Sequence, residues 1–325
     1  MTTGVFSASA ASVYLEYGFE STFGGGASGT ILFGKEVKAT GLEFKNNQMP
    51  LGQLYTTEVE SFAYGKNEGK VSVEYVLSNP WFLQSIFSDS TSASVSGTLY
   101  SHTWESDPAT NSTVRDLNTM ALRLGYDVNA NFLREPVGAV CSSLSFKMAI
   151  GEPIKITQEI IWGEETNTET FLAPTGTALA GEAPYTFVNA VITSPLTGTT
   201  LATIQLFDLN LNTNAELLFE FGSALSKDAW RKILEMTGKV TVTVKDSGFI
   251  KEVLDRAESA NDMVVTISNG ASGNALREIV MTFSGVGFHT HGNTGIEPGQ
   301  LVLENIDFQA RSCTVVAKNQ AATVP

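Results

Sequence analysis

The chain has 325 residues, a formal net charge of −14 and a hydrophobic content of 42%. This composition is that of a globular protein with room for about two domains, and it excludes a disordered chain. No run of about 20 apolar residues occurs, so we expect no membrane-spanning helix, and the first residues show no secretory signal peptide. The acids are spread over both halves, which disfavours a surface that grips DNA by its phosphates.

Residues 1–40 hold the aromatics Tyr14, Tyr17, Phe19 and Phe23, followed by a run of glycines. We expect an N-terminal arm, because this segment is too polar and glycine-rich to form a core of its own. Behind it, alternation of apolar and polar residues with a period of two predicts strands with one buried face. These strands are expected at Val71 to Val76, Met120 to Tyr126, Leu144 to Ile150, Lys155 to Ile160, Val240 to Val244, Ile279 to Phe283 and Leu301 to Phe308.

Helical patterns are short and few. They cover Pro80 to Ser88, Lys227 to Met236 and Phe249 to Ala257. The first and third carry apolar residues at matching positions, so we expect two equivalent helices packed on a sheet. Their core residues are predicted to be Phe82, Ile86, Phe249 and Val253. The fold class is therefore mainly β, with a short flanking helix in each domain.

The chain repeats itself with a period of about 160 residues, which is domain-sized. Gly69-Lys70-Val71 returns as Gly238-Lys239-Val240, an apolar cluster follows each copy, and an alternating segment that runs into asparagine precedes each. We interpret this as a duplicated and fused domain, which halves the copies needed to close a symmetric ring. The predicted divisions are 1–40 (arm), 41–165 (first domain), 166–183 (linker), 184–319 (second domain) and 320–325 (C-terminal tail).

Signals for catalysis are poor. His289 and His291 could share one face of a strand, but no third ligand is near except Glu297, so exposed loop histidines are the favoured interpretation. Cys141 and Cys313 are too few for a disulfide framework and are expected to be buried free thiols. We predict no enzyme, no catalytic residues, no metal and no cofactor. A β-sandwich hydrolase or cupin-like metal enzyme is one alternative, and a secreted β-sandwich adhesin or carbohydrate-binding module is another.

Four passages, taken in order, carry a resemblance to a known family. They are the aromatic segment Val13 to Gly24, the strand–turn–strand Leu144 to Thr157 with its Gly-Glu-Pro turn, the strand opening at Pro184 to Ala190, and the asparagine-rich strand end Leu209 to Glu216. Together they resemble a tail tube protein of tailed viruses, of the type in which the tube domain occurs twice in one chain. The match spans nearly the whole chain.

The resemblance implies a structural virion protein, assembled in the host cytoplasm and located in the virion tail. Tandem β-sandwich or barrel-like tube domains would form rings that stack into a hollow tube for genome delivery. The duplication predicts three chains per ring with pseudo-sixfold symmetry. Implied partners are the chain itself, a tape-measure protein and double-stranded DNA passing without specific binding, a tail terminator and baseplate or tip proteins. Whether a sheath surrounds the tube stays open.

Two surfaces follow from this resemblance. The arm and the polar insertion Glu105 to Asn118 should contact the next ring, because both break the repeat. The residues named for this contact are Tyr14, Tyr17, Phe19, Phe23, Asp107 and Asp116. The polar positions of the alternating strands should line the lumen, with Glu43 and Glu74 as the predicted lumen-facing acids that repel DNA phosphates.

Overall fold

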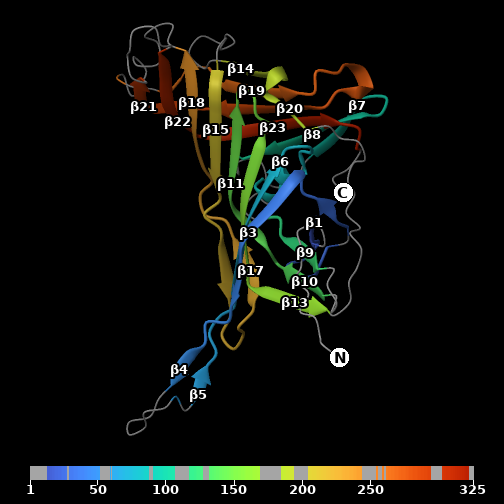
Figure 1. Ribbon diagram of the computed structural model, residues 1–325, viewed down its shortest axis with the longest axis vertical. Coiled ribbons are helices and arrows are strands. Elements are labelled where there is room, and N and C mark those ends of the chain that lie inside the picture. Colours follow the sequence, from blue (N-terminus) through green and yellow to red (C-terminus); the bar gives the residue numbers. More distant parts are fainter. Residues whose placement is uncertain are drawn as a thin grey trace, which may run out of the picture.

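The computed structural model describes residues 13–27, 29–51, 59, 61–87, 91–106, 117–126, 132–168, 184–193, 204–243, 254, 258–259, 261–293 and 302–321. These residues form antiparallel sheets with a few short turns of helix, which confirms the expected mainly-β class. Figure 1 shows one large sheet along the long axis of the molecule, a second sheet lying across its upper end, and a third beside its lower part.

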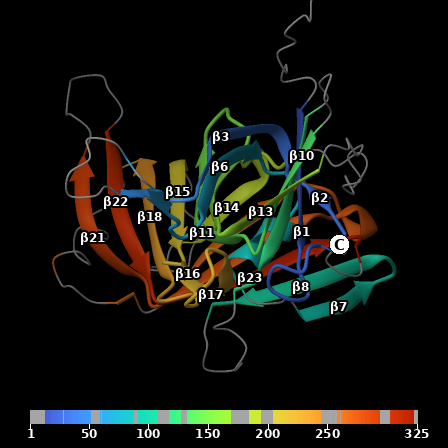
Figure 2. The same cartoon turned by 90° about the horizontal axis from the view of Figure 1, so that it is seen from below.

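The large sheet has eight strands, contributed equally by the two halves of the chain (Figures 1 and 2). In spatial order they are β3 (Lys35–Lys45), β6 (Glu68–Val76), β12 (Lys155–Trp162), β11 (Val140–Ala149), β15 (Ile204–Asn212), β18 (Glu235–Thr243), β22 (Leu303–Ala310) and β21 (Gly287–Asn293). The two-residue alternation of the sequence buries one face. In β6, for example, Val71, Val73 and Tyr75 are buried while Lys70 is exposed.

The sheet across the upper end has six strands, and it also mixes the two halves. They are β14 (Ala190–Thr193), β19 (Met263–Ser268), β20 (Glu278–Ser284), β23 (Ser312–Asn319), β8 (Leu99–Glu105) and β7 (Thr91–Ser96). The third sheet has five strands: β13 (Glu164–Thr168), β10 (Phe132–Val137), β9 (Met120–Tyr126), β1 (Val13–Phe19) and β2 (Ile31–Leu32). One hydrophobic cluster draws buried side chains from all three sheets, so the halves share a core.

The N-terminal segment is part of this core. Strand β1 lies in the middle of the five-stranded sheet and pairs with β9 from Val13 to Phe19. Tyr17 is 2% exposed, and its ring lies 4.5 Å from that of Phe33. The glycines after it are held by Glu20, whose carboxylate accepts hydrogen bonds from the backbone N–H groups of Gly24, Gly26 and Gly138.

The helical expectations need correction. No α-helix spans Pro80 to Ser88; the segment contains a single 3₁₀ turn, η2 (Trp81–Ser85), in which Phe82 is 3% exposed, and Ile86 just after it is fully buried. Two further 3₁₀ turns lie among the described residues, η3 (Phe187–Asn189) and η4 (Gly273–Ala275). Phe249 and Val253 lie outside the described residues, so the second helix stays a prediction.

The helix predicted for Lys227 to Met236 is wrong. Residues Ser226–Trp230 form strand β17, which pairs with β16 (Glu216–Phe219), and β18 already begins at Glu235. Ala229 packs in a small cluster with Leu117 and Val140 of the first half. This packing and the main-chain pairing outweigh a weak local helix preference.

A second two-stranded hairpin, β4 (Met49–Leu51) with β5 (Ser61–Ala63), projects from the lower end of the molecule (Figure 1). Both hairpins follow the same plan. Each begins after an asparagine with positive φ, Asn47 (44°) or Asn214 (48°). Each asparagine side chain donates to a backbone carbonyl, that of Lys66 at 2.9 Å or Ile233 at 3.0 Å, nineteen residues further on in both cases.

The large sheet consists of two sets of four strands, or quartets, with the same arrangement. In each quartet the first and second strands along the chain are followed in space by the fourth and then the third. The first quartet reads β3-β6-β12-β11 and the second β15-β18-β22-β21. Equivalent positions also match in packing. Gly69 pairs with Trp162, and Gly238 pairs with Phe308. A Cβ atom would lie 2.1 Å from the Trp162 ring at the first glycine and 2.4 Å from the Phe308 ring at the second. Each aromatic ring therefore needs a glycine on the neighbouring strand.

Candidate assembly surfaces

The large sheet ends in two open edges. Strands β3 and β21 each pair with a neighbour on one side only within the described part of the chain. Strand β3 is eleven residues long, and nearly all of it is exposed on both faces. A long exposed edge strand presents unpaired backbone N–H and C=O groups, and natural proteins rarely leave such an edge uncovered. These edges are candidates for pairing with another chain.

One face of the large sheet is polar, and charges of opposite sign are neighbours on it. The register pairs Lys147 with Asp208, Asp208 with Lys239, and Lys239 with Asp307, so one row crosses four strands with alternating charge. Cross-strand neighbours of opposite charge attract each other modestly. Lys147 and Lys239 are therefore placed beside carboxylates, whereas Lys155 of β12, on the other side of Lys147 in this row, lies beside a lysine.

The two acids named for the lumen lie on this same polar face. Glu43 of β3 lies 2.7 Å from Lys45 and 3.4 Å from Lys70, and Glu74 of β6 lies 3.6 Å from Lys38. The contact with Lys45 and then that with Lys70 lower the pKa of Glu43. Both acids are therefore compensated by lysines.

The residues named for inter-ring contact have unequal surroundings. Tyr17 is buried inside this chain, so the contact would have to come from the others. Tyr14, Phe19 and Phe23 are partly exposed, and two of them cover glycines: Tyr14 lies over Gly125, and Phe23 lies over Gly138. Asp107 and Asp116 lie outside the described residues, as does most of the insertion.

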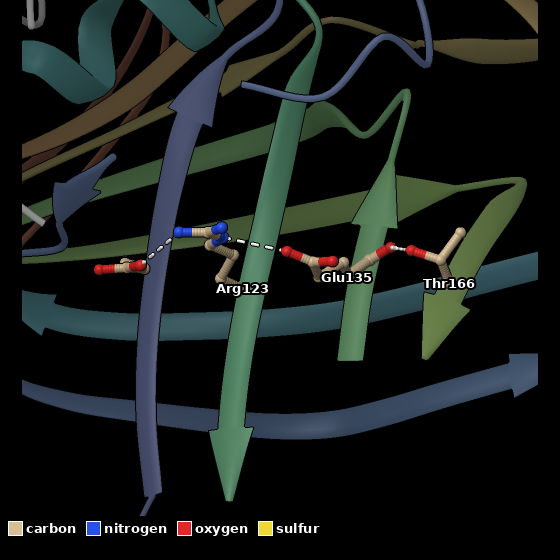
Figure 3. Close-up of polar contacts among 4 residues, drawn as sticks. Arg123, Glu135 and Thr166 are labelled. Carbon is tan, nitrogen blue, oxygen red and sulfur yellow. Dashed lines mark hydrogen bonds and ion pairs between the residues drawn. The ribbon is translucent and has the colours of Figure 1, made fainter. Parts of the chain in front are cut away.

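A chain of charged side chains crosses the five-stranded sheet (Figure 3). Arg123 of β9 donates to Glu135 of β10 at 3.0 Å and lies 3.5 Å from Glu16 of β1, whose side chain is fully buried. Thr166 of β13 donates its hydroxyl to the backbone carbonyl of Glu135. A second pair, Arg134 with Glu165, flanks it. These contacts link strands β1, β9, β10 and β13, so their role is structural.

The two histidines considered as metal ligands lie on a strand, and Glu297, the third ligand considered with them, lies outside the described residues. His289 lies at a bulge of edge strand β21 next to Gln309, and His291 contacts Glu304 at 2.7 Å, so neither belongs to a loop as expected. Among the residues that the structure describes, no three His, Cys, Asp or Glu side chains come together as metal ligands. Within the same residues, no helix is long and apolar enough to cross a membrane.

Comparison with known proteins identifies the family of the chain. A family model described as a phage tail tube protein matches residues 4–310. The chain belongs to the phage tail tube protein family. A search of curated proteins finds no match. The family is one of structural tail proteins rather than enzymes, and membership implies a virion tail component that self-assembles into a tube. In such a tail tube protein, open edges and exposed apolar hairpins are expected assembly surfaces.

Sequence reasoning missed one of these surfaces, the hairpin β4–β5. Met49, Leu51, Phe62 and Tyr64 are 58%, 50%, 58% and 80% exposed. No sequence signal located it, because the equal spacing from Asn47 to Lys66 and from Asn214 to Ile233 becomes visible only through the side-chain hydrogen bonds of the structure.

Proposed function

We propose that this protein polymerises as stacked rings into the hollow tail tube through which the viral genome is delivered. Each ring contains three chains with pseudo-sixfold symmetry. The observation that carries this proposal is the eight-stranded sheet: two quartets with one strand order, open at both ends. Because its two edges differ, copies joined edge to edge form head-to-tail contacts, which generate a ring when the rotation closes.

A tandem duplication of one tube domain explains the quartets. It is supported by the repeated strand order, by the glycine–aromatic pairs Gly69–Trp162 and Gly238–Phe308, and by the two hairpins of equal register. Three chains of eight strands give a ring of 24 strands. The internal contact between β11 and β15 serves as the pattern for the contact between chains, where β21 of one copy meets β3 of the next.

We propose that the polar face of the large sheet lines the lumen, with Glu43 and Glu74 on it. Most lysines there are placed beside acids, as in the row Lys147–Asp208–Lys239–Asp307, and Lys155, which pairs with Lys147, is an exception. A lining of this kind holds water and offers DNA phosphates few uncompensated lysines, so the genome passes without arrest.

Replacing Asp208 with asparagine should leave tube assembly intact and make the lumen bind DNA. The substitution removes the carboxylate that lies between Lys147 and Lys239, and each lysine that then contacts a phosphate should steepen the slope of log K against log salt concentration by about one unit. Binding of a short DNA duplex to purified tubes at several salt concentrations measures this. Adding Lys147→Gln and Lys239→Gln should abolish the binding. Tubes of the Asp208→Asn variant that bind no more DNA than wild type would contradict a lumen role.

The remaining partners follow from a position in the tail. A tape-measure protein and double-stranded DNA would occupy the lumen without specific binding, and terminator and baseplate or tip proteins would close the ends. Assembly takes place in the host cytoplasm. Tyr14, Phe19 and Phe23, with the insertion Glu105 to Asn118, remain our proposal for contacts between stacked rings.

Electron microscopy of the purified protein tests the proposed function. Negatively stained samples should show rings or striated hollow tubes, with the striation repeating once per ring. A matched sample in the same buffer, diluted under conditions in which the chain stays folded, should shift towards single chains. Sedimentation would show this shift. A folded protein that stays monomeric at high concentration would overturn the proposal.

A further inference from the structure

The two hairpins share one fold but have opposite surroundings. Their pairing registers place Phe62 of β5 where Ala229 stands in β17, and the residue after each strand is Tyr64 in one and Arg231 in the other. In hairpin β16–β17, Ala229 is 8% exposed and Arg231 6%. In hairpin β4–β5, Phe62 is 58% exposed and Tyr64 80%. Hairpin β4–β5 therefore exposes the positions that hairpin β16–β17 buries.

The cover of hairpin β16–β17 comes from the opposite half of the chain. Ala229 clusters with Val140 of β11, and Ile161 of β12 packs against the same cluster, as does Leu217 of β16 in the hairpin itself. Arg231 donates to the backbone carbonyl of Ile86 at 3.1 Å. The hairpin that follows β15 thus lies on β11 and β12, beside the junction at which β15 and β11 pair. The second half clasps the first half in this way.

We propose that hairpin β4–β5 clasps strands β21 and β22 of a neighbouring copy of the same chain, within one ring. Strands β21 and β22 hold the place in the second quartet that β11 and β12 hold in the first. Thr290 pairs with Asp307 there as Val140 pairs with Ile161, which puts Phe62 against Thr290 and Asp307 of the neighbour. This contact rests on the proposed ring.

Three features on these surfaces favour a second copy as the occupant. Strand β3 leads directly into the hairpin, so the open edge and the clasp reach the same neighbour, as β15 and β16–β17 do inside the chain. The side-chain sizes complement each other: the larger Phe62 replaces Ala229, and the smaller Thr290 and Asp307 replace Val140 and Ile161. Finally, a projecting hairpin with four exposed apolar side chains is a liability in a monomer.

Cysteine cross-linking between chains tests the clasp. Chains carrying Phe62→Cys are mixed with chains carrying Thr290→Cys, assembled, and oxidised mildly. The native thiols interfere little, since both are buried and burial raises the pKa of Cys141 to about 12 and that of Cys313 as well. A disulfide-linked dimer is expected from this mixture. The matched control replaces Thr290→Cys with Val191→Cys, an exposed site on β14 of the six-stranded sheet, and should give none.

A charge substitution gives a second, independent readout. Phe62→Asp should leave the melting temperature of the single chain unchanged and abolish rings, whereas Ala229→Asp should lower the melting temperature because its cover lies inside the chain. Rings with no Phe62–Thr290 cross-link, or rings formed normally by Phe62→Asp, would overturn the clasp while the tube function stands. Wild-type protein that forms no rings would overturn both.

Discussion

Replacing Phe82 with alanine should lower the free energy of unfolding by about 3–5 kcal/mol. The side chain is 3% exposed in η2 and belongs to the main hydrophobic cluster together with Trp81, Leu83 and Ile86. Truncation leaves a cavity that neighbours held by three sheets cannot fill. Urea unfolding of the single chain, followed by tryptophan fluorescence, measures the loss.

The matched control is Phe62→Ala, the same substitution at a side chain that is 58% exposed. It should change the free energy of unfolding by less than about 1 kcal/mol. A cost below about 1 kcal/mol for Phe82→Ala as well would mean that the η2 segment is not part of the folded core and serves a contact instead.

Replacing Arg123 with alanine should cost about 3–5 kcal/mol, because it removes the positive charge that lies 3.5 Å from the fully buried Glu16 side chain and 3.0 Å from Glu135. The loss should appear in the same unfolding experiment. Adding Glu16→Gln to the variant should recover much of it, since an amide carries no charge to desolvate. Lys38→Ala removes an exposed pair with Glu74 and should change nothing measurable. Equal effects of Arg123→Ala and Lys38→Ala would contradict the structural role of the charged chain.

Most strands could be predicted from the sequence, because one buried face imposes a two-residue period. The strand expected at Met120 to Tyr126 is β9 with the same bounds, and those at Lys155 to Ile160 and Ile279 to Phe283 lie within β12 and β20. The pattern says which residues face inward but not which strands are neighbours. The sharing of sheets by the two halves therefore could not be derived from it.

The failures have identifiable causes. Strand β17 is short and, among the described residues, pairs with β16 alone, so its sequence resembles a helix as long as its packing against Val140 is unknown. The N-terminal segment contributes a strand through Tyr17, although its glycines suggested a separate arm. The two hairpin sequences share few residue types, so their equivalence is visible only in three dimensions.

The assembly surfaces were the least predictable part. An exposed edge or hairpin carries no chemical motif, and its meaning depends on what the rest of the chain leaves uncovered. The strand order that the two quartets share suggests that meaning here: β15 with hairpin β16–β17 displays, inside one chain, the contact that β3 with hairpin β4–β5 lacks among the described residues. The surfaces proposed to join copies into a ring are the equivalents, in the first half of the chain, of those that join the two halves to each other.

The most direct test of this account is the number of chains in one ring, counted in a helical reconstruction of assembled tubes. We predict three chains per ring and a closed barrel of 24 strands, with β21 of each chain beside β3 of the next. A ring of six or more chains, or a barrel in which β3 stays unpaired, would contradict it.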